Sequence, residues 1–366
     1  MSGTHGSPAT RLLIGTRKGL FRIQQPAGGE DWRLDGPHLA GYEVIHACTA
    51  PRNPLLIHAA VSHPVWGAHI YRSSNGGDDW EALATAPHFE HDRYGHRLKA
   101  IWFLVWSPRG DALYAGIDPA GLFVSRDAGR SWQEIETLNE HPTRALWEPS
   151  RGIFAVHSIC IGPDDPARMA VAVSAGGVYC SDDSGGSWRP ANAGVRAENL
   201  PTPGAVAGHN VHRLIMHPRA PGRLYRQCYN GSYRSEDWGR SWTEITAGLP
   251  SDFGYAMATP IGDPDTVFQI PESGSHMRTT VDGKLRVFRS RDAGASWRSA
   301  SEGLPQEHAY VTVLREAMDT DDRDGVFFGT SSGHLFASTD GADSWHLIAS
   351  FLPRILCVLA LPTSSP

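Results

Sequence analysis

The chain has 366 residues, of which 40% are hydrophobic, so a sizeable buried core is available. Its net charge of −6 argues against a nucleic-acid partner, since nucleic-acid binders carry a basic excess. The sequence has no run of eighteen apolar residues that would predict a membrane-spanning helix. The N-terminus lacks the apolar stretch of a secretion signal and the five cysteines include no CxxC pair, so we expect a cytoplasmic protein with reduced thiols and no membrane partner.

The chain begins with ten residues that are expected to be disordered, and strands follow at once. RLLIGTRKGLFRI (11–23) predicts two strands around the turn GTRKG, and DWRLDGP (31–37) predicts a third. At the far end, RILCVLALP (354–362) is one apolar strand without a sheet of its own. Pairing it with the N-terminal strands would close a ring without leaving an exposed sheet edge.

Between these ends an eight-residue motif recurs every 48 to 56 residues, which indicates a repeat architecture. Its copies are SSNGGDDW from Ser73, SRDAGRSW from Ser125, SDDSGGSW from Ser181, SEDWGRSW from Ser235, SRDAGASW from Ser290 and STDGADSW from Ser338. Around each copy, turn residues separate four short apolar segments, as in HSICIGPDDPARMAVAVSAGGVYCSDDSGGSWRPA from His157. Four short strands of this kind predict one antiparallel blade of a β-propeller.

The motif, called the box below, has a structural interpretation. Its aspartate can accept backbone N–H groups across the turn, and its glycine permits a positive φ. Its tryptophan is expected to be buried and to plug the sheet stack, as we predict for Trp132, Trp188, Trp242 and Trp297. A ligand-binding role for the box is the alternative.

The box SxDxGxSW resembles the Asp-box, or BNR, repeat of the sialidase-like β-propellers. The resemblance implies an all-β chain, and with the closing strand we expect a single seven-bladed propeller over residues 11–362. The predicted blades are approximately 11–34 plus 354–361, 43–84, 98–136, 155–191, 210–247, 255–300 and 310–350. In that family the boxes lie away from the active site, and the same box occurs in sialidases, xyloglucanases, sorting receptors and photosystem assembly factors.

The innermost strands suggest a central site. His157, His212 and Trp102 each stand six residues before a proline, and His46 stands five before one. Because side chains alternate along a strand, we expect these four residues around one cavity on the axis. The imidazoles of His46, His157 and His212 could hold one divalent metal ion there; the alternative is that each only makes hydrogen bonds.

Loops on one face add candidate binding residues, since loops on a rigid scaffold often carry function. HPTRALWEP is expected to fold over the channel mouth, with Arg144 binding an anionic or polar small molecule. The candidate catalytic residues are His157, His212, Arg144 and Tyr310, and the candidate substrate-binding residues are Trp102, His141, Trp147, His209, Asn210, Glu272, His276, Arg278 and Arg315.

The resemblance implies a triad of arginines, a tyrosine nucleophile paired with a glutamate, and an aspartate acid. In this chain the early Arg-Ile-Pro motif is missing, and Tyr310 or Tyr255 with Glu272 falls at no recognisable family position. A true exo-sialidase is therefore not expected. The sequence favours a hydrolase or lyase that acts on a small anionic or polar substrate in a His/Arg/Trp-lined pocket. The alternative is a non-catalytic propeller that binds a protein or peptide on the same face.

Overall fold

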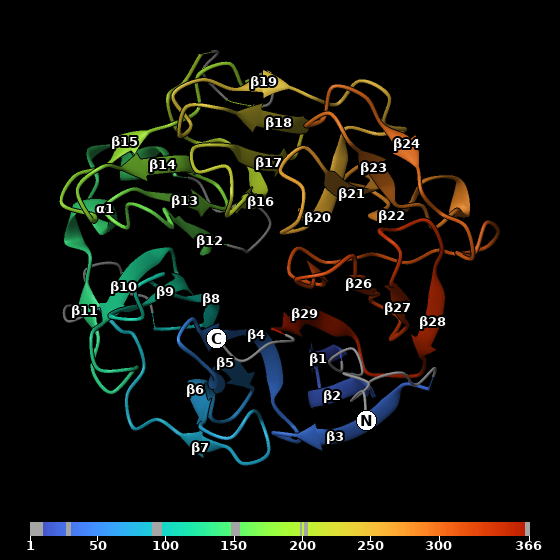
Figure 1. The fold of residues 1–366 in the computed structure, drawn as a ribbon. Helices are drawn as coiled ribbons and strands as arrows, with labels where there is room; N and C mark the ends of the chain where they lie inside the picture. The colour runs from blue at the N-terminus through green and yellow to red at the C-terminus, as the bar shows by residue number, and fades with distance from the viewer. Residues whose placement is uncertain are drawn as a thin grey trace, which may run out of the picture.

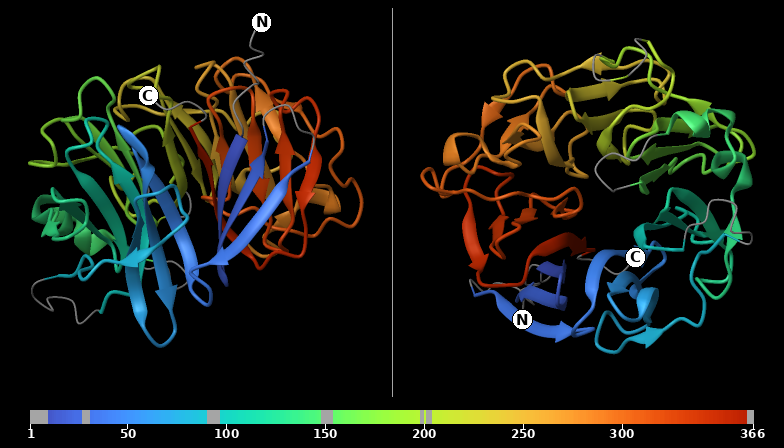
Figure 2. Two further views of the ribbon diagram at one scale, coloured as in Figure 1. Left: turned by 60° about the horizontal axis from the view of Figure 1, so that its bottom comes forward. Right: turned by 180° about the vertical axis from the view of Figure 1, so that it is seen from behind.

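The structure is a computed structural model that describes residues 10–26, 31–89, 97–147, 154–197, 200 and 204–362. Seven antiparallel sheets stand around a central axis, each with a path of four strands from the centre to the rim (Figure 1). The all-β, seven-bladed propeller predicted from the sequence is therefore confirmed. Figure 2 shows the same ring tilted and from behind.

In the first four blades, four strands lead from the centre outward. Blade 1 contains β29 (Ile355–Leu361), β1 (Thr10–Thr16), β2 (Gly19–Gln25) and β3 (Arg33–His38). Blade 2 contains β4 (Glu43–Ala50), β5 (Asn53–His63), β6 (Gly67–Ser73) and β7 (Glu81–Ala82). Blade 3 contains β8 (Ala100–Trp106), β9 (Leu113–Asp118), β10 (Gly121–Ser125) and β11 (Gln133–Glu134). Blade 4 contains β12 (Val156–Ile161), β13 (Met169–Val173), β14 (Gly177–Ser181) and β15 (Arg189–Pro190).

The remaining blades have the same order. Blade 5 contains β16 (Val211–Met216), β17 (Leu224–Cys228), β18 (Gly231–Ser235) and β19 (Thr243–Glu244). Blade 6 contains β20 (Phe253–Ala258), β21 (Val267–Ser273), β23 (Phe288–Ser290) and β24 (Arg298–Ser299), with β22 (Thr279–Thr280) paired to β21. Blade 7 contains β25 (Met318–Thr320), β26 (Val326–Gly329), β27 (Leu335–Ser338) and β28 (His346–Ala349).

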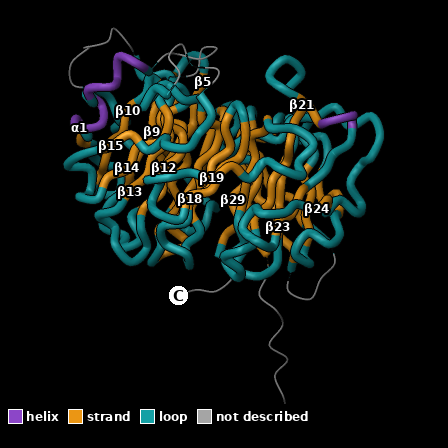
Figure 3. Tube along the Cα trace, turned by 90° about the horizontal axis from the view of Figure 1, so that it is seen from above, coloured by secondary structure: helices purple, strands orange, loops and turns teal. Residues whose placement is uncertain are grey.

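The described helices are short and lie outside the blades. They are α1 (Glu136–Asn139) and the 3-10 turns η1 (Pro142–Leu146) and η2 (Val281–Gly283). Seen from the side in Figure 3, α1 lies at the edge of the ring. None of the helices in the described ranges has the length or apolar character to cross a membrane.

The ring closes as the terminal sequences predicted. β29 pairs antiparallel with β1, from Arg11 opposite Leu361 to Thr16 opposite Ile355. The C-terminal strand thereby becomes the innermost strand of the first blade. Thr10, placed by the sequence in a disordered N-terminus, begins β1, and residues 1–9 lie outside the described residues.

The box builds the same turn in each blade that carries it. In blade 5, Asp237 Oδ1 accepts the Ser241 N–H at 2.9 Å, and Ser235 Oγ accepts the Gly239 N–H at 2.8 Å. Gly239 has a φ of +72°, as the turn requires. These contacts confirm the structural interpretation of the aspartate and the glycine.

In the described part of the chain, three box tryptophans donate a hydrogen bond to the preceding blade. Trp242 Nε1 donates to Ala191 O at 2.8 Å, and Trp297 Nε1 donates to Ile245 O at 2.7 Å, each reaching the outer strand region of the preceding blade. Trp188, Trp242 and Trp297 are buried as predicted, whereas Trp132 is only half-buried. Trp132 therefore plugs its sheet less completely than its counterparts.

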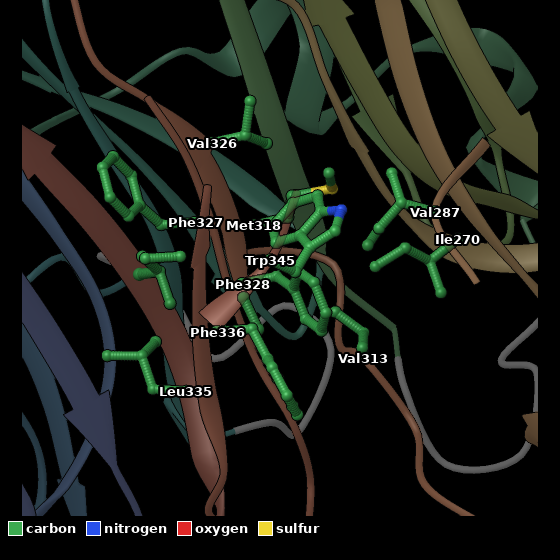
Figure 4. Close-up of a cluster of buried hydrophobic side chains, with 14 of the residues drawn as sticks. Ile270, Val287, Val313, Met318, Val326, Phe327, Phe328, Leu335, Phe336 and Trp345 are labelled. Atoms are coloured by element: carbon green, nitrogen blue, oxygen red, sulfur yellow. The ribbon is translucent and has the colours of Figure 1, made fainter. Parts of the chain in front are cut away.

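Apolar side chains fill the spaces between blades. Between blades 6 and 7, Figure 4 shows Phe328, Phe336 and Trp345 facing Ile270 and Val287. The five cysteines are all buried and free, as expected for reduced core thiols.

Candidate functional site

A central cavity of about 490 Å³ lies where the innermost strands begin. All seven blades contribute to its lining, which consists of Arg17, Glu43, Ile45, Ser62, Lys99, Ala100, Trp102, Ser174, Asn210, His212, Tyr255, Arg278, Thr312, Leu314, Arg315, Glu316, Arg354 and Leu356. Most of these residues stand in loops that lead into innermost strands or in turns between second and third strands. We call the face that carries these loops and turns the upper face.

A β-bulge in the innermost strands aims side chains at this cavity. The register shifts once near the start of six innermost strands, which leaves Leu356, Ile45, Trp102, His157, His212 and the pair Tyr255–Ala256 at the bulges. Bulges commonly redirect a side chain next to a binding site. The first five of these bulges lie six residues before a proline, so the spacing seen in the sequence marks a real structural position.

The bulge position corrects the set of channel residues expected from the sequence. Trp102 and His212 line the cavity, as expected. In blade 2, however, the equivalent residue is Ile45, because it is Ile45 that stands six residues before Pro51. The sequence prediction therefore named the residue that follows the bulge position. His46 does not line the cavity.

His157 occupies the bulge in blade 4 but points into the neighbouring blade. Its side chain is nearly inaccessible, since the residue is 1% exposed. Its Nε2 donates to Val211 O at 3.0 Å, and its Nδ1 lies 3.1 Å from Ser158 Oγ. Both ring nitrogens are thus occupied within the protein, and His157 does not line the cavity as predicted.

The three histidines proposed as metal ligands do not form a metal site. His46 Nδ1 accepts the Leu104 N–H at 3.3 Å, and His212 Nδ1 donates to Gly254 O at 2.8 Å. In the described part of the chain, no group of three or more His, Cys, Asp or Glu side chains could hold a metal ion. The described residues therefore give no support to a metal site built from His46, His157 and His212.

Burial keeps the channel histidines neutral. Burial and, to a smaller extent, the charge of Arg315 together lower the pKa of His212 to about 3. Because a carbonyl oxygen only accepts, the His212 proton is on Nδ1 and Nε2 keeps its lone pair. His212 also packs on Tyr255, with ring centroids 4.7 Å apart.

Among the described residues, cations outnumber acids in the cavity lining, five to two. Arg17 forms an ion pair with Glu43 at 2.8 Å. Glu316 forms an ion pair with Arg213, a residue that does not line the cavity. Lys99 lies 3.9 Å from Asp118, outside the lining. The remaining lining cations are Arg278, Arg315 and Arg354.

Arg315 is held between two aromatic rings. Its guanidinium carbon lies 5.6 Å from the centroid of the Trp102 ring and 5.2 Å from that of Tyr255. Its Nε and the Trp102 Nε1 are buried donors without a hydrogen-bond partner among the described residues. Burial lowers the Arg315 pKa from its ordinary value. Such unpartnered donors beside a cavity are suited to receive a ligand acceptor.

Two buried glutamates lie at or near the cavity. Burial raises the pKa of Glu316, and the positive charge of Arg213 offsets part of this rise. Glu316 Oε1 has no hydrogen-bond partner in the described part of the chain. Burial raises the pKa of Glu272 to about 8, although the Val313 N–H donates to its Oε1 at 3.0 Å. Glu272 does not line the cavity, and its bond to Val313 holds the segment that leads to Arg315.

The segment around Arg144 does not reach the cavity. Arg144 Nη2 donates to Ala120 O at 2.8 Å, and its guanidinium lies 5.1 Å from the Trp147 ring centroid. Trp147 is buried, with Nε1 donating to Tyr179 Oη at 2.6 Å, and His141 Nε2 lies 3.2 Å from Trp188 O. These contacts hold the segment on the outer strands of blades 3 and 4. The expectation that it folds over the channel mouth is wrong for the described residues.

The other predicted site residues divide between cavity and rim. Asn210, Arg278 and Arg315 line the cavity. Tyr310 is 66% exposed and does not line it; Tyr255 does. His276 is exposed, and His209 is buried with its Nε2 bonded to Ala205 O at 3.0 Å. Tyr310, His276 and His209 are thus outside the lining.

Several lining residues were not among the predicted site residues, namely Arg17, Glu43, Lys99, Glu316 and Arg354. Features of the sequence could have indicated three of these residues. Arg17 is in the turn GTRKG, Arg354 precedes the closing strand, and Glu316 directly follows Arg315. The residues just before each innermost strand would have been a better search window than the longest loops.

The fold and the cavity define a seven-bladed β-propeller with a cation-rich central pocket. No family model matches the chain. It is 22% identical over 300 residues to an oligoxyloglucan-reducing end-specific xyloglucanase of Emericella nidulans, a match that covers 72% of this chain and 34% of that protein. It is 24% identical over 262 residues to xyloglucanase Xgh74A of Acetivibrio thermocellus, covering 64% and 30%. The chain thus spans about a third of the length of these relatives.

Solved structures with the same fold include three of different description. An ancestral GH74 enzyme matches with a TM-score of 0.56 at 14% identity, covering 88% of this chain and 38% of that one. YCF48 bound to D1 peptide matches with 0.52 at 15%, covering 88% and 93%. A putative 6-phosphogluconolactonase from Bacteroides fragilis matches with 0.60 at 9%, covering 98% and 99%. At these identities the likeness shows the fold, and the resemblance to the sialidase-like family stays a resemblance.

Proposed function

We propose that this propeller is a hydrolase whose central cavity binds a small anionic molecule such as a sugar acid or sugar phosphate. The observation that carries the proposal is the excess of cations in the lining, with Arg315 held between Trp102 and Tyr255. A planar guanidinium can bind a carboxylate or phosphate through two parallel hydrogen bonds. Two aromatic walls can also pack against the apolar face of a sugar ring.

The cavity also contains groups suited to acid–base chemistry. Glu316, ion-paired with Arg213, has an Oε1 without a hydrogen-bond partner among the described residues that can accept a proton, and the neutral His212 presents a lone pair on Nε2. We assign the Glu316 carboxylate as the base that activates water and His212 Nε2 as a hydrogen-bond acceptor for a substrate hydroxyl. The similarity to xyloglucanases supports hydrolysis as the reaction class, while the cations favour an anionic substrate over a neutral glucan.

A hydrolysis assay with paired substrates tests the proposal. Aryl glucuronides and sugar phosphate lactones are compared with neutral aryl glucosides and xyloglucan oligosaccharides, in the native protein and in Glu316→Gln and Arg315→Met. We expect turnover of an anionic substrate that falls about tenfold or more in each variant. Arg298→Ala, an exposed position on the outer strand β24, is the control. Faster turnover of the neutral substrates, or equal turnover by Arg315→Met, would exclude the proposed site.

A second candidate function is peptide binding on the upper face. Of the eleven exposed large hydrophobic residues among the described ranges, seven belong to upper-face loops and turns: Val65, Trp66, Leu146, Val206, Met277, Tyr310 and Phe351. Exposed apolar side chains on one face can contribute to an interaction site. The structure of YCF48 with a peptide shows that a propeller of this fold can bind one. The fitting partner is an extended peptide with apolar side chains and a free C-terminal carboxylate for the cavity cations.

Binding measurements with a synthetic peptide distinguish the two candidates. An apolar peptide with a free C-terminus is compared with its amidated form, in the native protein and in Trp66→Ser and Phe351→Ser. Peptide binding predicts loss of affinity on amidation and in both variants. If the peptide does not bind while a sugar acid does, the peptide function is excluded.

A further inference from the structure

The residues that directly follow the bulges differ in what they bind. His46, Ser158 and Arg213 hold this position in blades 2, 4 and 5, and none of them lines the cavity. His46 Nδ1 accepts the Leu104 N–H at 3.3 Å, and Ser158 Oγ accepts the Leu214 N–H at 3.3 Å, so both side chains join one blade to the next. An arginine side chain has no acceptor and cannot take this role. The presence of Arg213 at this position therefore needs another explanation.

Arg213 forms an ion pair between blades that are not neighbours. Its Nη1 contacts Oε2 of Glu316, and the two side chains are 13% and 9% exposed. Arg213 is in β16 of blade 5, whereas Glu316 lies two residues before β25 of blade 7. Blade 6 stands between these blades, so the two side chains meet in the central channel. The ion pair therefore does not serve to pack one blade on the next.

Glu316 is held at its backbone and at one carboxylate oxygen. The Val358 N–H donates to Glu316 O at 2.8 Å, which fixes the backbone on β29. Besides Arg213, the His46 Nε2 lies 3.7 Å from Oε2, and it carries the proton of the neutral imidazole because Nδ1 is an acceptor. Glu316 lines the cavity, and its Oε1 has no hydrogen-bond partner in the described part of the chain. These contacts engage Oε2 and leave Oε1 for a molecule in the cavity.

Arg213 also acts on the charge of Glu316. Burial raises the pKa of Glu316, whereas the charge and the hydrogen bond of Arg213 lower it, and the charge of Arg315 lowers it further. The other titratable side chains that interact with this pair are His46, Asp319, Cys160 and Cys357. Burial keeps His46 neutral by lowering its pKa to about 3, and it raises the pKa of both thiols to about 12. Burial raises the pKa of Asp319 to about 6, so Asp319 is the neighbour whose titration must be told apart from that of Glu316.

We propose that Arg213 is a positioning residue, which holds Oε2 of Glu316, keeps the carboxylate ionised and so leaves Oε1 to take a proton from water. The inference rests on the function proposed for the central cavity. Arg213 acts through Glu316, because it does not line the cavity itself. A guanidinium suits this role, since it stays charged at every working pH and binds a carboxylate in a fixed geometry. An ion pair with a structural role alone would affect stability but would not set the pH at which Glu316 gains its proton.

An NMR titration of protein with isotope-labelled glutamate measures the protonation of Glu316 without any substrate. The Glu316 signal is the one that is absent from Glu316→Gln, and the labelling leaves Asp319 unobserved. In Arg213→Met the midpoint should rise by about one pH unit or more, because burial remains while the cation is lost. Arg213→Gln, which keeps donors but not the charge, should show the same rise if the Met variant does not fold. Arg213→Lys should stay closer to the native midpoint.

The matched control for this titration is Arg223→Met. Arg223 also joins two blades by ion pairs, with Glu236 at 3.0 Å and Asp265 at 2.6 Å, but it does not line the cavity or contact Glu316. Its loss should change stability and leave the Glu316 midpoint where it is. An unchanged midpoint in both Arg213→Met and Arg213→Gln would overturn the role of Arg213.

Turnover of nitrophenyl glucuronide at different pH values connects this charge to the reaction. A base must be ionised, so activity should be present above the pKa of Glu316 and lost as the pH falls through it. Arg213→Met should move this loss to higher pH and lower kcat about tenfold or more at pH 6, with KM within about twofold of native. Arg213→Lys should recover most of the activity, and Asp319→Asn should keep the native pH profile.

The two measurements separate the possible failures. A native pH profile in Arg213→Met would overturn the positioning role even if the native protein turns over the glucuronide. If the native protein turns over no anionic substrate, the proposed function fails and the catalytic role of Arg213 fails with it. The NMR midpoint then still shows whether Arg213 controls the charge of Glu316.

Discussion

At the scale of single residues, one backbone irregularity decides which side chains face the cavity. Trp102 and His212 reach it because each is at a bulge six residues before a proline. His157 shares that position, yet Val211 O and Ser158 Oγ bind its ring. The spacing could therefore be predicted from the sequence, but the direction of each side chain depends on polar partners in the next blade. Such partners are set by the tertiary structure.

Glu272 predicts a pH dependence of stability. Its pKa rises from an ordinary value of 4.5 to about 8 through burial, so the folded state holds a proton that the unfolded state releases in this range. Its contribution to stability is fully present below pH 4.5 and is lost as the pH rises to about 8. We expect Glu272→Gln to flatten the fall in unfolding free energy between pH 5 and 8. Denaturant unfolding at several pH values measures this, and an unchanged slope in the variant would contradict the assignment.

The box tryptophans predict unequal costs of truncation. Trp242 is buried and bonded to the preceding blade, so Trp242→Ala should lower the free energy of unfolding by about 3–5 kcal/mol. Trp132 is half-buried, and its Nε1 has no partner among the described residues, so Trp132→Ala should cost less. Chemical denaturation of both variants compares them. Equal costs would show that burial and the bond between blades do not explain the role of the tryptophan.

At the scale of elements, the strands could be predicted from the sequence, whereas the positions of the connecting loops could not. The box fixes its turn through local bonds such as Ser241 N–H to Asp237, so each of the six blades with a box could be recognised from one short stretch. The segment of α1 and η1 has no such local code. Its position depends on Trp147 finding Tyr179 in another blade, a contact between distant residues. The sequence therefore suggested that this loop, which is rich in Arg, His and Trp, binds a ligand. In the structure its side chains pack against the blades instead.

The closing strand β29 predicts the effect of a truncation. Removing residues 354–366 would expose the edge of β1 and take Ile355, Cys357 and Leu361 from the core. We expect aggregation or a large fall in Tm, since an unpaired edge strand invites association. Removing only residues 363–366 is the matched control and should leave the Tm unchanged. A soluble protein with the native transition after the longer truncation would refute closure through β29.

At the scale of the whole molecule, the ring brings together residues that are far apart in sequence. Arg17, Lys99, Arg278, Arg315 and Arg354 come from four blades and meet only because the ring closes. The number of blades and the existence of a central pocket could be predicted from repeats and composition. The excess of cations could not, because it arises from single residues at the starts of different strands. Their convergence carries the functional proposal.

Binding calorimetry measures the central claim most directly. Glucose 6-phosphate and glucuronate are titrated into the native protein and into Arg315→Met, with glucose as the neutral comparison. At least one of the two anions should bind about tenfold or more tightly than glucose, should weaken as salt is added, and should lose that advantage in Arg315→Met. If neither anion binds better than glucose, or if Arg315→Met binds them as the native protein does, the cavity is not an anion-binding site.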